Sequence, residues 1–178
     1  MSQPTEFRVA DLKPNRPVAV QFAPDTAQMK AIAELLGLDG LRKMTLKGEL
    51  TATGRSDWQF KGHLGATVIQ PCVVTLSPVT TRIEEDILRN FVTDWHEPED
   101  NEIEMPEDDT TEPLGEVIDV QKIALEALAL ALPAYPRAEG AALGEAIFSE
   151  PGTDPMSDED AKPFAALAAL KNKLDTPE

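Results

Sequence analysis

Residues 41–54 read LRKMTLKGELTATG, and their side chains alternate between two characters. The even positions from Met44 to Ala52 are apolar or small, whereas the odd positions from Lys43 to Thr53 are charged or hydroxylated. Because successive side chains of a strand point to opposite faces, this period of two predicts a strand with one buried and one solvated face. A sheet that is wet on one side is therefore the basis of the predicted fold.

A second alternating segment follows the turn-like residues Gly54–Asp57. Its apolar even positions extend from Trp58 to Cys72, and polar residues such as His63 occupy odd positions. Two alternating runs joined by a short polar turn predict a long antiparallel hairpin. The next segment, residues 80–92, is ambiguous, because apolar residues spaced by four satisfy both a strand face and a helix stripe.

An amphipathic helix is predicted before the hairpin, in DTAQMKAIAELLG, residues 25–37. Asp25 is a good N-cap with Gln28 three positions later, and Gly37 suits the left-handed conformation at a helix C-terminus. Apolar residues recur at helical spacing between these two ends. We therefore expect this helix to lie on the sheet.

A second, apolar helix is predicted at Val120–Leu132, preceded by Asp119 as a cap and ended by Pro133. A helix that is apolar almost all round is central to a core or covered by a partner. The predicted fold class is α+β, a long antiparallel sheet on which an N-terminal amphipathic helix and a C-terminal apolar helix pack.

The composition divides the chain into three parts. Residues 1–137 are predicted to form a single α+β domain with an acidic, proline-interrupted loop at residues 95–113. Residues 138–162 have the composition of a disordered acidic linker. Residues 163–174 predict a short helical motif, and a helix of about 12 residues is marginal alone. This motif either packs on its own domain or docks on a partner, and the sequence leaves both interpretations open.

The formal net charge of -16 is unevenly distributed. Residues 1–70 hold nine Lys or Arg and seven Asp or Glu, whereas residues 71–178 hold seven basic and twenty-five acidic residues. An acidic surface repels RNA and attracts basic proteins over a Debye length of about 10 Å at 0.1 M salt. Acidity can equally serve solubility alone. An acidic mimic of nucleic acid, which would bind DNA-binding proteins, is a further alternative.

Two sets of residues are candidates for contact with macromolecules. A basic partner is expected to bind the acidic loop and the C-terminal motif, at Glu97, Glu99, Asp100, Glu102, Glu104, Phe164, Leu167, Leu170, Lys171 and Lys173. Weak RNA contact is expected on the wet face of the sheet, at Arg42, Lys43, Lys47, Arg55 and Lys61.

The only cysteine lies in residues 70–79, QPCVVTLSPV. One cysteine cannot form an internal disulfide, and with two histidines it falls short of a tetrahedral zinc site. The alternation places Cys72 on the buried side and His63 on the wet side, so a packed thiol is favoured over a nucleophile. We predict no catalytic, cofactor-binding or metal-binding residue. A small thiol-dependent enzyme that uses Cys72 is the alternative.

Neither a membrane-spanning segment nor a signal peptide is readable in the sequence, so a cytoplasmic monomer is expected. No run of apolar residues approaches the roughly 18 that a spanning helix needs.

Three blocks of sequence carry a resemblance to a known family. Residues 72–79, CVVTLSPV, resemble the C-x-x-C-L-x-P motif of the YceD family, the large ribosomal RNA subunit accumulation proteins. Residues 115–119, GEVID, lead into a helix that ends LALP at residues 130–133, which is similar to the family's G-E-I-D-L and L-P block. Residues 162–171, KPFAALAALK, resemble its terminal N-P-F-A-x-L-x-x-L-K box.

The resemblance implies a non-catalytic ribosome-assembly factor needed for accumulation or processing of the 23S rRNA of the large subunit. It also implies, as partner, a basic ribosomal protein of the large subunit or precursor 23S rRNA, because the family is associated by gene neighbourhood with a small basic zinc-ribbon protein of that subunit. No enzymatic activity is attached to the family, and its pattern favours a strand at residues 80–91.

The sequence departs from the family motif at the positions that bear on metal or thiol chemistry. Thr75 stands where the second cysteine would be, and Ala134–Arg137 stand where many members carry further cysteines. The remaining motif positions are therefore expected to have structural roles, namely Cys72, Leu76, Pro78, Gly115, Asp119 and Pro133.

Overall fold

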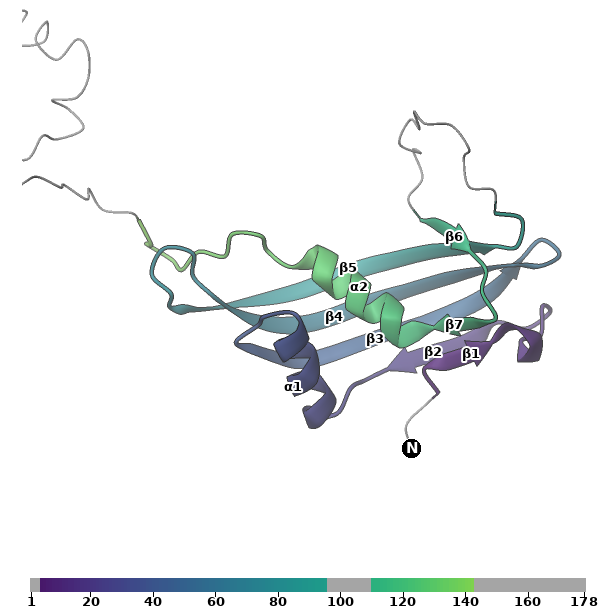
Figure 1. Cartoon of the computed structure of the whole chain (residues 1–178), viewed down its shortest axis with the longest axis horizontal. Coiled ribbons are helices and arrows are strands. Elements are labelled where there is room, and N and C mark those ends of the chain that lie inside the picture. The colour runs from purple at the N-terminus through teal and green to yellow at the C-terminus, as the bar shows by residue number, and fades with distance from the viewer. Residues whose placement is uncertain (1–3, 96–109, 143–178) are drawn as a thin grey trace, which may run out of the picture. The chain divides into compact units, whose positions relative to one another are not determined.

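Five strands form the main sheet of the structure, a computed structural model that describes residues 4–95 and 110–142 (Figure 1). Residues 4–95 and 110–139 belong to one compact unit. The strand order is β2-β3-β4-β5-β6. The strands are β2 (Val18–Phe22), β3 (Gly40–Thr53), β4 (Asp57–Pro71), β5 (Pro78–Val92) and β6 (Thr111–Pro113).

The predicted hairpin forms the centre of this sheet. β3 and β4 pair antiparallel, with Leu46 opposite Leu64 and Leu50 opposite Phe60. All four of these side chains are completely buried. Gly54 adopts a positive φ of 72° in the connecting turn, a conformation that costs glycine little. The alternation in the sequence therefore predicted both the pairing and the buried face.

Residues 80–92, whose apolar spacing was ambiguous, lie in strand β5, which pairs with β4 from Trp58 to Pro71. β2, β3, β4 and β5 pair antiparallel, but β6 runs parallel to the end of β5. The sheet is therefore not antiparallel throughout. β6 also falls at the end of the segment that was expected to be an acidic loop, because Thr111–Pro113 pair with Asn90–Val92.

Helix α1 (Thr26–Leu35) packs mainly against β3 and starts from a complete capping box. The Asp25 carboxylate accepts a hydrogen bond from the Gln28 amide, and the Gln28 side chain accepts one from the Asp25 amide. Ile32 and Ala33 are buried against the core. Gly37 has φ +64° just after the helix, as a C-terminal cap requires.

Helix α2 (Val120–Ala131) lies across the sheet and contacts β2, β4 and β5 (Figure 1). Asp119 caps it by accepting hydrogen bonds from the Gln121 and Lys122 amides. Its buried residues are Val120, Ile123, Ala124, Ala127 and Leu128. The helix ends one residue before the predicted Leu132, which serves as its C-cap. The mixed α+β architecture predicted from the sequence is confirmed.

A small second sheet joins the N-terminal segment to the start of α2. β1 (Glu6–Arg8) pairs antiparallel with β7 (Val117–Asp119), and the Val120 amide donates to the Thr5 carbonyl. A 3-10 turn, η1 (Val9–Asp11), follows β1. The sequence predicted extended residues near Val117 but neither β1 nor β2.

The rest of the predicted domain organisation concerns residues that lie outside the described part of the chain. Residues 96–109, most of the expected acidic loop, and residues 143–178, most of the expected linker and the C-terminal motif, are among them. Within the described residues, no helix is long and apolar enough to cross a membrane.

Candidate macromolecule-binding surfaces

One face of the main sheet is covered by the two helices, and in the described residues no helix covers the other. This second face, the open face, carries the odd-numbered residues of β3 from Thr45 onward, the odd-numbered residues of β4 and the even-numbered residues of β5. Cross-strand neighbours on it follow from the register, in which Lys47, His63 and Asp86 form one row. Glu49, Lys61 and Leu88 form the adjacent row.

The five residues predicted to contact RNA are all exposed, but they are not all in the same place. Lys47 and Lys61 lie on the open face, in the centre of β3 and β4. Arg42 and Lys43 lie at an irregularity of β3, and Arg55 lies in the turn between β3 and β4. The structure therefore brings Lys47 and Lys61 together and places Arg55 at one end of the hairpin.

A β-bulge between Arg42 and Thr45 interrupts the alternation of β3. Lys43 has a positive φ of 51° there, and its carbonyl accepts a hydrogen bond of 3.4 Å from Nη1 of Arg82 on β5. The same Nη1 donates to Thr67 at 3.4 Å. Before the bulge the odd-numbered Leu41 is buried and the even-numbered Arg42 is exposed, so the parity that the sequence suggested is reversed there, and no glycine marked the site.

His63 lies between two acidic residues of β5 on the open face. Its Nδ1 is 2.6 Å from Oδ1 of Asp86, and its Nε2 is 2.8 Å from Oε2 of Glu84. The hydrogen bond to Asp86, followed by that to Glu84, raises the pKa of His63 above its ordinary value. His63, followed by Arg82, lowers the pKa of Glu84. The sequence placed His63 on the wet face but could not identify its partners, because the fold of residues 80–92 was undecided.

The open face is consequently divided by charge. The exposed Lys47 and Lys61 lie on β3 and β4, with one exposed acid, Glu49, opposite Lys61, whereas the exposed acids Glu84 and Asp86 lie on β5. Arg82 is committed to Glu84, with Nη2 2.6 Å from Oε1. A polyanion would thus meet an attractive surface on one half of this face and a repulsive one on the other.

Cys72 directly follows β4, and its side chain is buried. The sulfur accepts hydrogen bonds from three amides, those of Val74 and Thr75 at 3.4 Å and that of Ala138 at 3.3 Å. The Ala138 amide foremost, then the Thr75 side chain and the Thr75 amide, lower the pKa of the thiol from 9.0 to about 6, although burial opposes the shift. The amides favour the thiolate, since they donate to the charged form.

A nucleophilic cysteine also needs a base and access to substrate. His63 is on the opposite face of the sheet from Cys72 and has both ring nitrogens bonded to acids. The other histidine, His96, lies outside the described residues. Among residues 4–95 and 110–142, no group of three His, Cys, Asp or Glu is arranged to hold a metal ion. The described geometry therefore gives Cys72 an altered pKa without a catalytic partner.

The other motif residues differ in their surroundings. Leu76 is 77% exposed and has a positive φ of 59°, so it contributes to the turn after Cys72 and not to the core. Pro78 begins β5, and the Pro133 carbonyl accepts a hydrogen bond of 3.3 Å from Gln70. Asp119 caps α2, as described above. Gly115 is exposed, and nothing in its conformation requires glycine.

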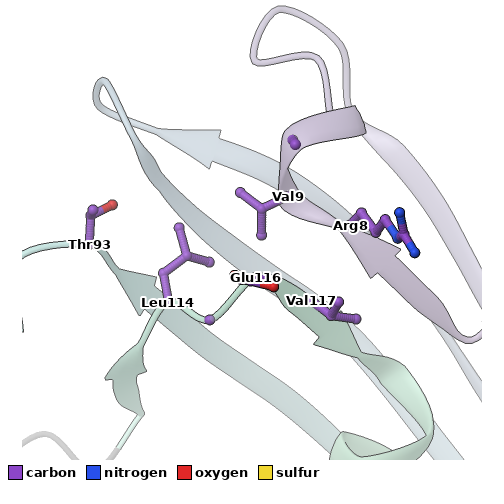
Figure 2. A pocket seen from close by; sticks show the side chains of 8 residues that line it. Arg8, Val9, Thr93, Leu114, Glu116 and Val117 are labelled. Carbon is purple, nitrogen blue, oxygen red and sulfur yellow. The ribbon is translucent and has the colours of Figure 1, made fainter.

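Gly115 borders a groove with a volume of about 890 Å³ (Figure 2). Val9 and Leu114 lie on opposite walls, and Arg8 and Thr93 lie toward its two ends (Figure 2). The Thr93 hydroxyl already donates to Ser56 and Asp57. Small-molecule sites usually combine apolar walls with a few convergent polar groups. In this groove the polar residues are separated, because Glu116 lies between Leu114 and Val117 whereas Arg8 and Thr93 lie toward the ends (Figure 2).

The residues predicted to bind a basic partner cannot be placed on these surfaces. Those of the acidic loop and of the C-terminal motif lie outside the described residues, namely Glu97, Glu99, Asp100, Glu102, Glu104, Phe164, Leu167, Leu170, Lys171 and Lys173.

The fold and these surfaces define an acidic α+β protein, and in the described residues its exposed charged groups are spread over a sheet. Residues 60–171 match the model of the family described as large ribosomal RNA subunit accumulation protein YceD. The chain belongs to the YceD family. Neither a search of curated proteins nor a search of solved structures finds a match.

Proposed function

We propose that the protein is a non-catalytic ribosome-assembly factor that supports accumulation or processing of 23S rRNA. It does so by binding a basic ribosomal protein of the large subunit, precursor 23S rRNA, or both. The family assignment supports a role in large-subunit rRNA accumulation. The observation that carries the choice of partner is charge, since residues 71–178 hold twenty-five acidic and seven basic residues.

A basic protein is the favoured partner because the acidic half accelerates its encounter and repels bare RNA. While bound, the ribosomal protein would be shielded from nonspecific contact with RNA. The acidic side chains from Glu97 to Glu104 and the apolar side chains of the C-terminal motif are proposed to take part. The protein would then act as a monomeric carrier in the cytoplasm, where ribosomes are assembled, and would need no cofactor.

RNA contact is proposed for the β3–β4 half of the open face. Lys47 and Lys61 are exposed there, with Arg42 and Lys43 at the bulge and Arg55 at the turn. Five cations on one hairpin support weak, salt-sensitive phosphate binding. Glu84 and Asp86 on the neighbouring strand limit the extent of that surface, which favours a contact secondary to protein binding.

The test is recovery of partners from cells that carry an affinity-tagged full-length chain. The recovery is done in about 0.1 M salt, where the Debye length is about 10 Å. We expect a basic protein of the large subunit, with or without precursor 23S rRNA, and co-sedimentation of the chain with pre-large-subunit particles. Depletion of the protein is expected to lower 23S rRNA relative to 16S rRNA. Recovery of neither partner, together with an unchanged rRNA ratio, would refute the proposal.

One substitution distinguishes a thiol-dependent enzyme from a non-catalytic assembly factor. Cys72→Ala removes the thiol but leaves every charged group in place. If the protein is a non-catalytic factor, cells that carry the folded Cys72→Ala variant should keep the 23S to 16S ratio of cells with the native chain. Loss of function in a variant that folds normally would favour thiol chemistry.

A further inference from the structure

In the described residues, one edge of the long strand β5 is largely unpaired. On one side it pairs with β4 from Pro78 to Phe91, and on the other side β6 pairs only with Asn90–Val92. Figure 1 shows β5 as the outermost long strand, with the short β6 beside one end of it. In the described part of the chain, no strand pairs with the outer side of residues 80–88, which we call the β5 edge.

Two hydrogen bonds determine which residues present their backbone at this edge. The Asn90 amide donates outward to the Thr110 carbonyl, and the Val92 carbonyl accepts from the Leu114 amide, each at 2.8 Å. Because backbone groups along an antiparallel strand alternate between its two sides, the other even-numbered residues also point outward. The N–H and C=O groups of the β5 edge thus belong to Thr80, Arg82, Glu84, Asp86 and Leu88.

The β5 edge is acidic on both faces of the sheet. Glu84 and Asp86 project onto the open face, where both contact His63 and Glu84 also pairs with Arg82, and the exposed Glu85 projects onto the face that carries α2. A groove of about 400 Å³ runs beside Glu85 between β5 and α2. Its apolar residues include Leu130, which is 76% exposed although it lies on a helix of the core.

We propose that the β5 edge binds a lysine- and arginine-rich extended segment of a protein partner as an added strand. The inference rests on the proposed function and names the docking site for its basic partner. An added strand would satisfy the outward backbone groups, and its alternate side chains would reach Glu84 and Asp86 on one face and Glu85 and Leu130 on the other. Backbone bonds would supply affinity and the acids would select basic sequences.

Charge argues against a second copy of this chain as the occupant. Antiparallel pairing of two β5 edges in the register centred on Glu85 would place Glu84, Glu85 and Asp86 of one copy against the same three residues of the other, and the register centred on Glu84 would still place Glu84 opposite its own copy. Like charges directly opposite each other in a sheet are destabilising. A cationic strand at the same position meets the opposite sign, so the edge selects a heterologous partner.

The probe for this site is a synthetic nine-residue peptide that alternates lysine or arginine with valine. Its matched control has the same sequence and charge but carries N-methyl groups on every second residue, which removes the donors that face β5. We expect the unmethylated peptide to bind the full-length chain at least tenfold more tightly at physiological salt. Its binding should protect the amides of Thr80, Arg82, Glu84, Asp86 and Leu88 from hydrogen exchange.

Two variants separate the contribution of the acidic side chains to peptide binding from that of the backbone groups. Glu84→Gln, Glu85→Gln and Asp86→Asn together should weaken peptide binding at least tenfold at low salt. Leu88→Pro, which removes one outward N–H and keeps all three acids, should weaken binding at least fivefold. The control variant carries the same number of neutralised acids elsewhere, Asp11→Asn, Glu34→Gln and Glu139→Gln, and should change binding less than twofold. Each variant is first compared with the native chain in thermal unfolding.

Equal binding of the methylated and unmethylated peptides would overturn the proposal, because attraction would then be electrostatic and would not use the strand. Protection elsewhere than at the β5 edge would also overturn it. If the three acids only guard the edge against pairing, their neutralisation will cause self-association and the peptide will not protect the edge. Recovery of a basic ribosomal protein by the triple β5 variant at native yield would refute this site while leaving the proposed function intact.

Discussion

The amide of Ala138 donates a hydrogen bond to the sulfur of Cys72, which lies 66 positions earlier in the chain, over 3.3 Å. A second contact supports this approach, because the Val73 amide donates to the Pro136 carbonyl at 2.9 Å. The segment after α2 therefore returns to the turn that follows β4.

Removal of the Ala138 donor should raise the pKa of the Cys72 thiol, because this amide is the largest cause of its low value of about 6. Ala138→Pro removes the N–H, whereas the control Ala138→Gly keeps it. The ultraviolet absorbance of the thiolate, followed against pH, measures the pKa directly. We expect a clear upward shift in the proline variant alone. If the thiolate titrates at the same pH in both variants, the other donors are sufficient to keep the pKa of Cys72 low.

The low thiol pKa also predicts how stability depends on pH. The folded pKa of Cys72 is about 6 and its unfolded reference is 9.0, so the unfolded chain binds more protons between these values. The free energy of unfolding contributed by the thiolate should therefore rise from pH 6 to pH 9 and be lost as the pH falls through 6. Denaturant unfolding of the native chain and of Cys72→Ser across this range measures the difference. If the difference in unfolding free energy between the two proteins does not change with pH, the pKa of Cys72 is not lowered in the folded chain.

Asp86→Asn should lower the pKa of His63, because the hydrogen bond to Asp86 is the main cause that raises it. The matched control is Glu85→Gln, since Glu85 is the neighbouring acid and projects onto the opposite face. The imidazole resonances of His63, titrated by NMR, should shift with pH at a lower midpoint in Asp86→Asn only. An equal effect of both substitutions would mean that the general field of the acids, and not the 2.6 Å contact, sets the pKa.

A raised histidine pKa has the opposite consequence for stability from a lowered cysteine pKa. The protonated form of His63 is favoured in the folded chain, so its contribution is fully present below the unfolded value of 6.5. It is lost as the pH rises through the folded pKa. Stability at neutral pH therefore depends on two groups with opposite slopes, Cys72 and His63, which the single substitutions above separate.

Much of the sheet was predictable because its alternation is long and regular. Trp58, Phe60 and Leu64 fall at even positions, and that period alone placed them in the core and Cys72 on the buried side. Short elements carry no comparable signal. β6 has only three residues. Its register against β5 depends on the path of the connection between the two strands, which cannot be read from the sequence.

The candidate surfaces were less predictable than the core. His63 was placed on the wet face, but its partners Glu84 and Asp86 lie on a strand whose identity as a strand the apolar spacing left undecided. The bulge at Lys43 was not predictable, because lysine rarely adopts a positive φ and the deviation is fixed by Arg82 from another strand. One signal was available and was not used, since Val18, Val20 and Phe22 of β2 alternate like those of β3.

Gly62→Ala should destabilise the protein by about 1–3 kcal/mol, as overpacking of a core does. A Cβ atom at position 62 would lie 2.6 Å from the Phe60 ring and 3.0 Å from the Lys47 carbonyl, and neither the buried ring nor the backbone of β3 can move freely. Gly115→Ala is the control, because a Cβ there meets nothing closer than 3.8 Å and should change stability by less than about 0.5 kcal/mol. Denaturant midpoints measure both. Equal midpoints would show that the Phe60 ring rearranges without cost.

Replacement of Lys47 and Lys61 by glutamine should weaken binding to precursor 23S rRNA uniformly and reduce its dependence on salt. Both lysines are exposed at the centre of the open face, on strands that pair with each other. Each phosphate contact releases counterions and contributes about 0.7 to the slope of log K against log salt for single strands, so two lost contacts lower the slope by about 1 to 2. Lys13→Gln with Lys30→Gln is the matched control, because these exposed lysines lie off the sheet. If both pairs reduce the slope equally, RNA responds to the net charge of the chain and the open face is not its binding surface.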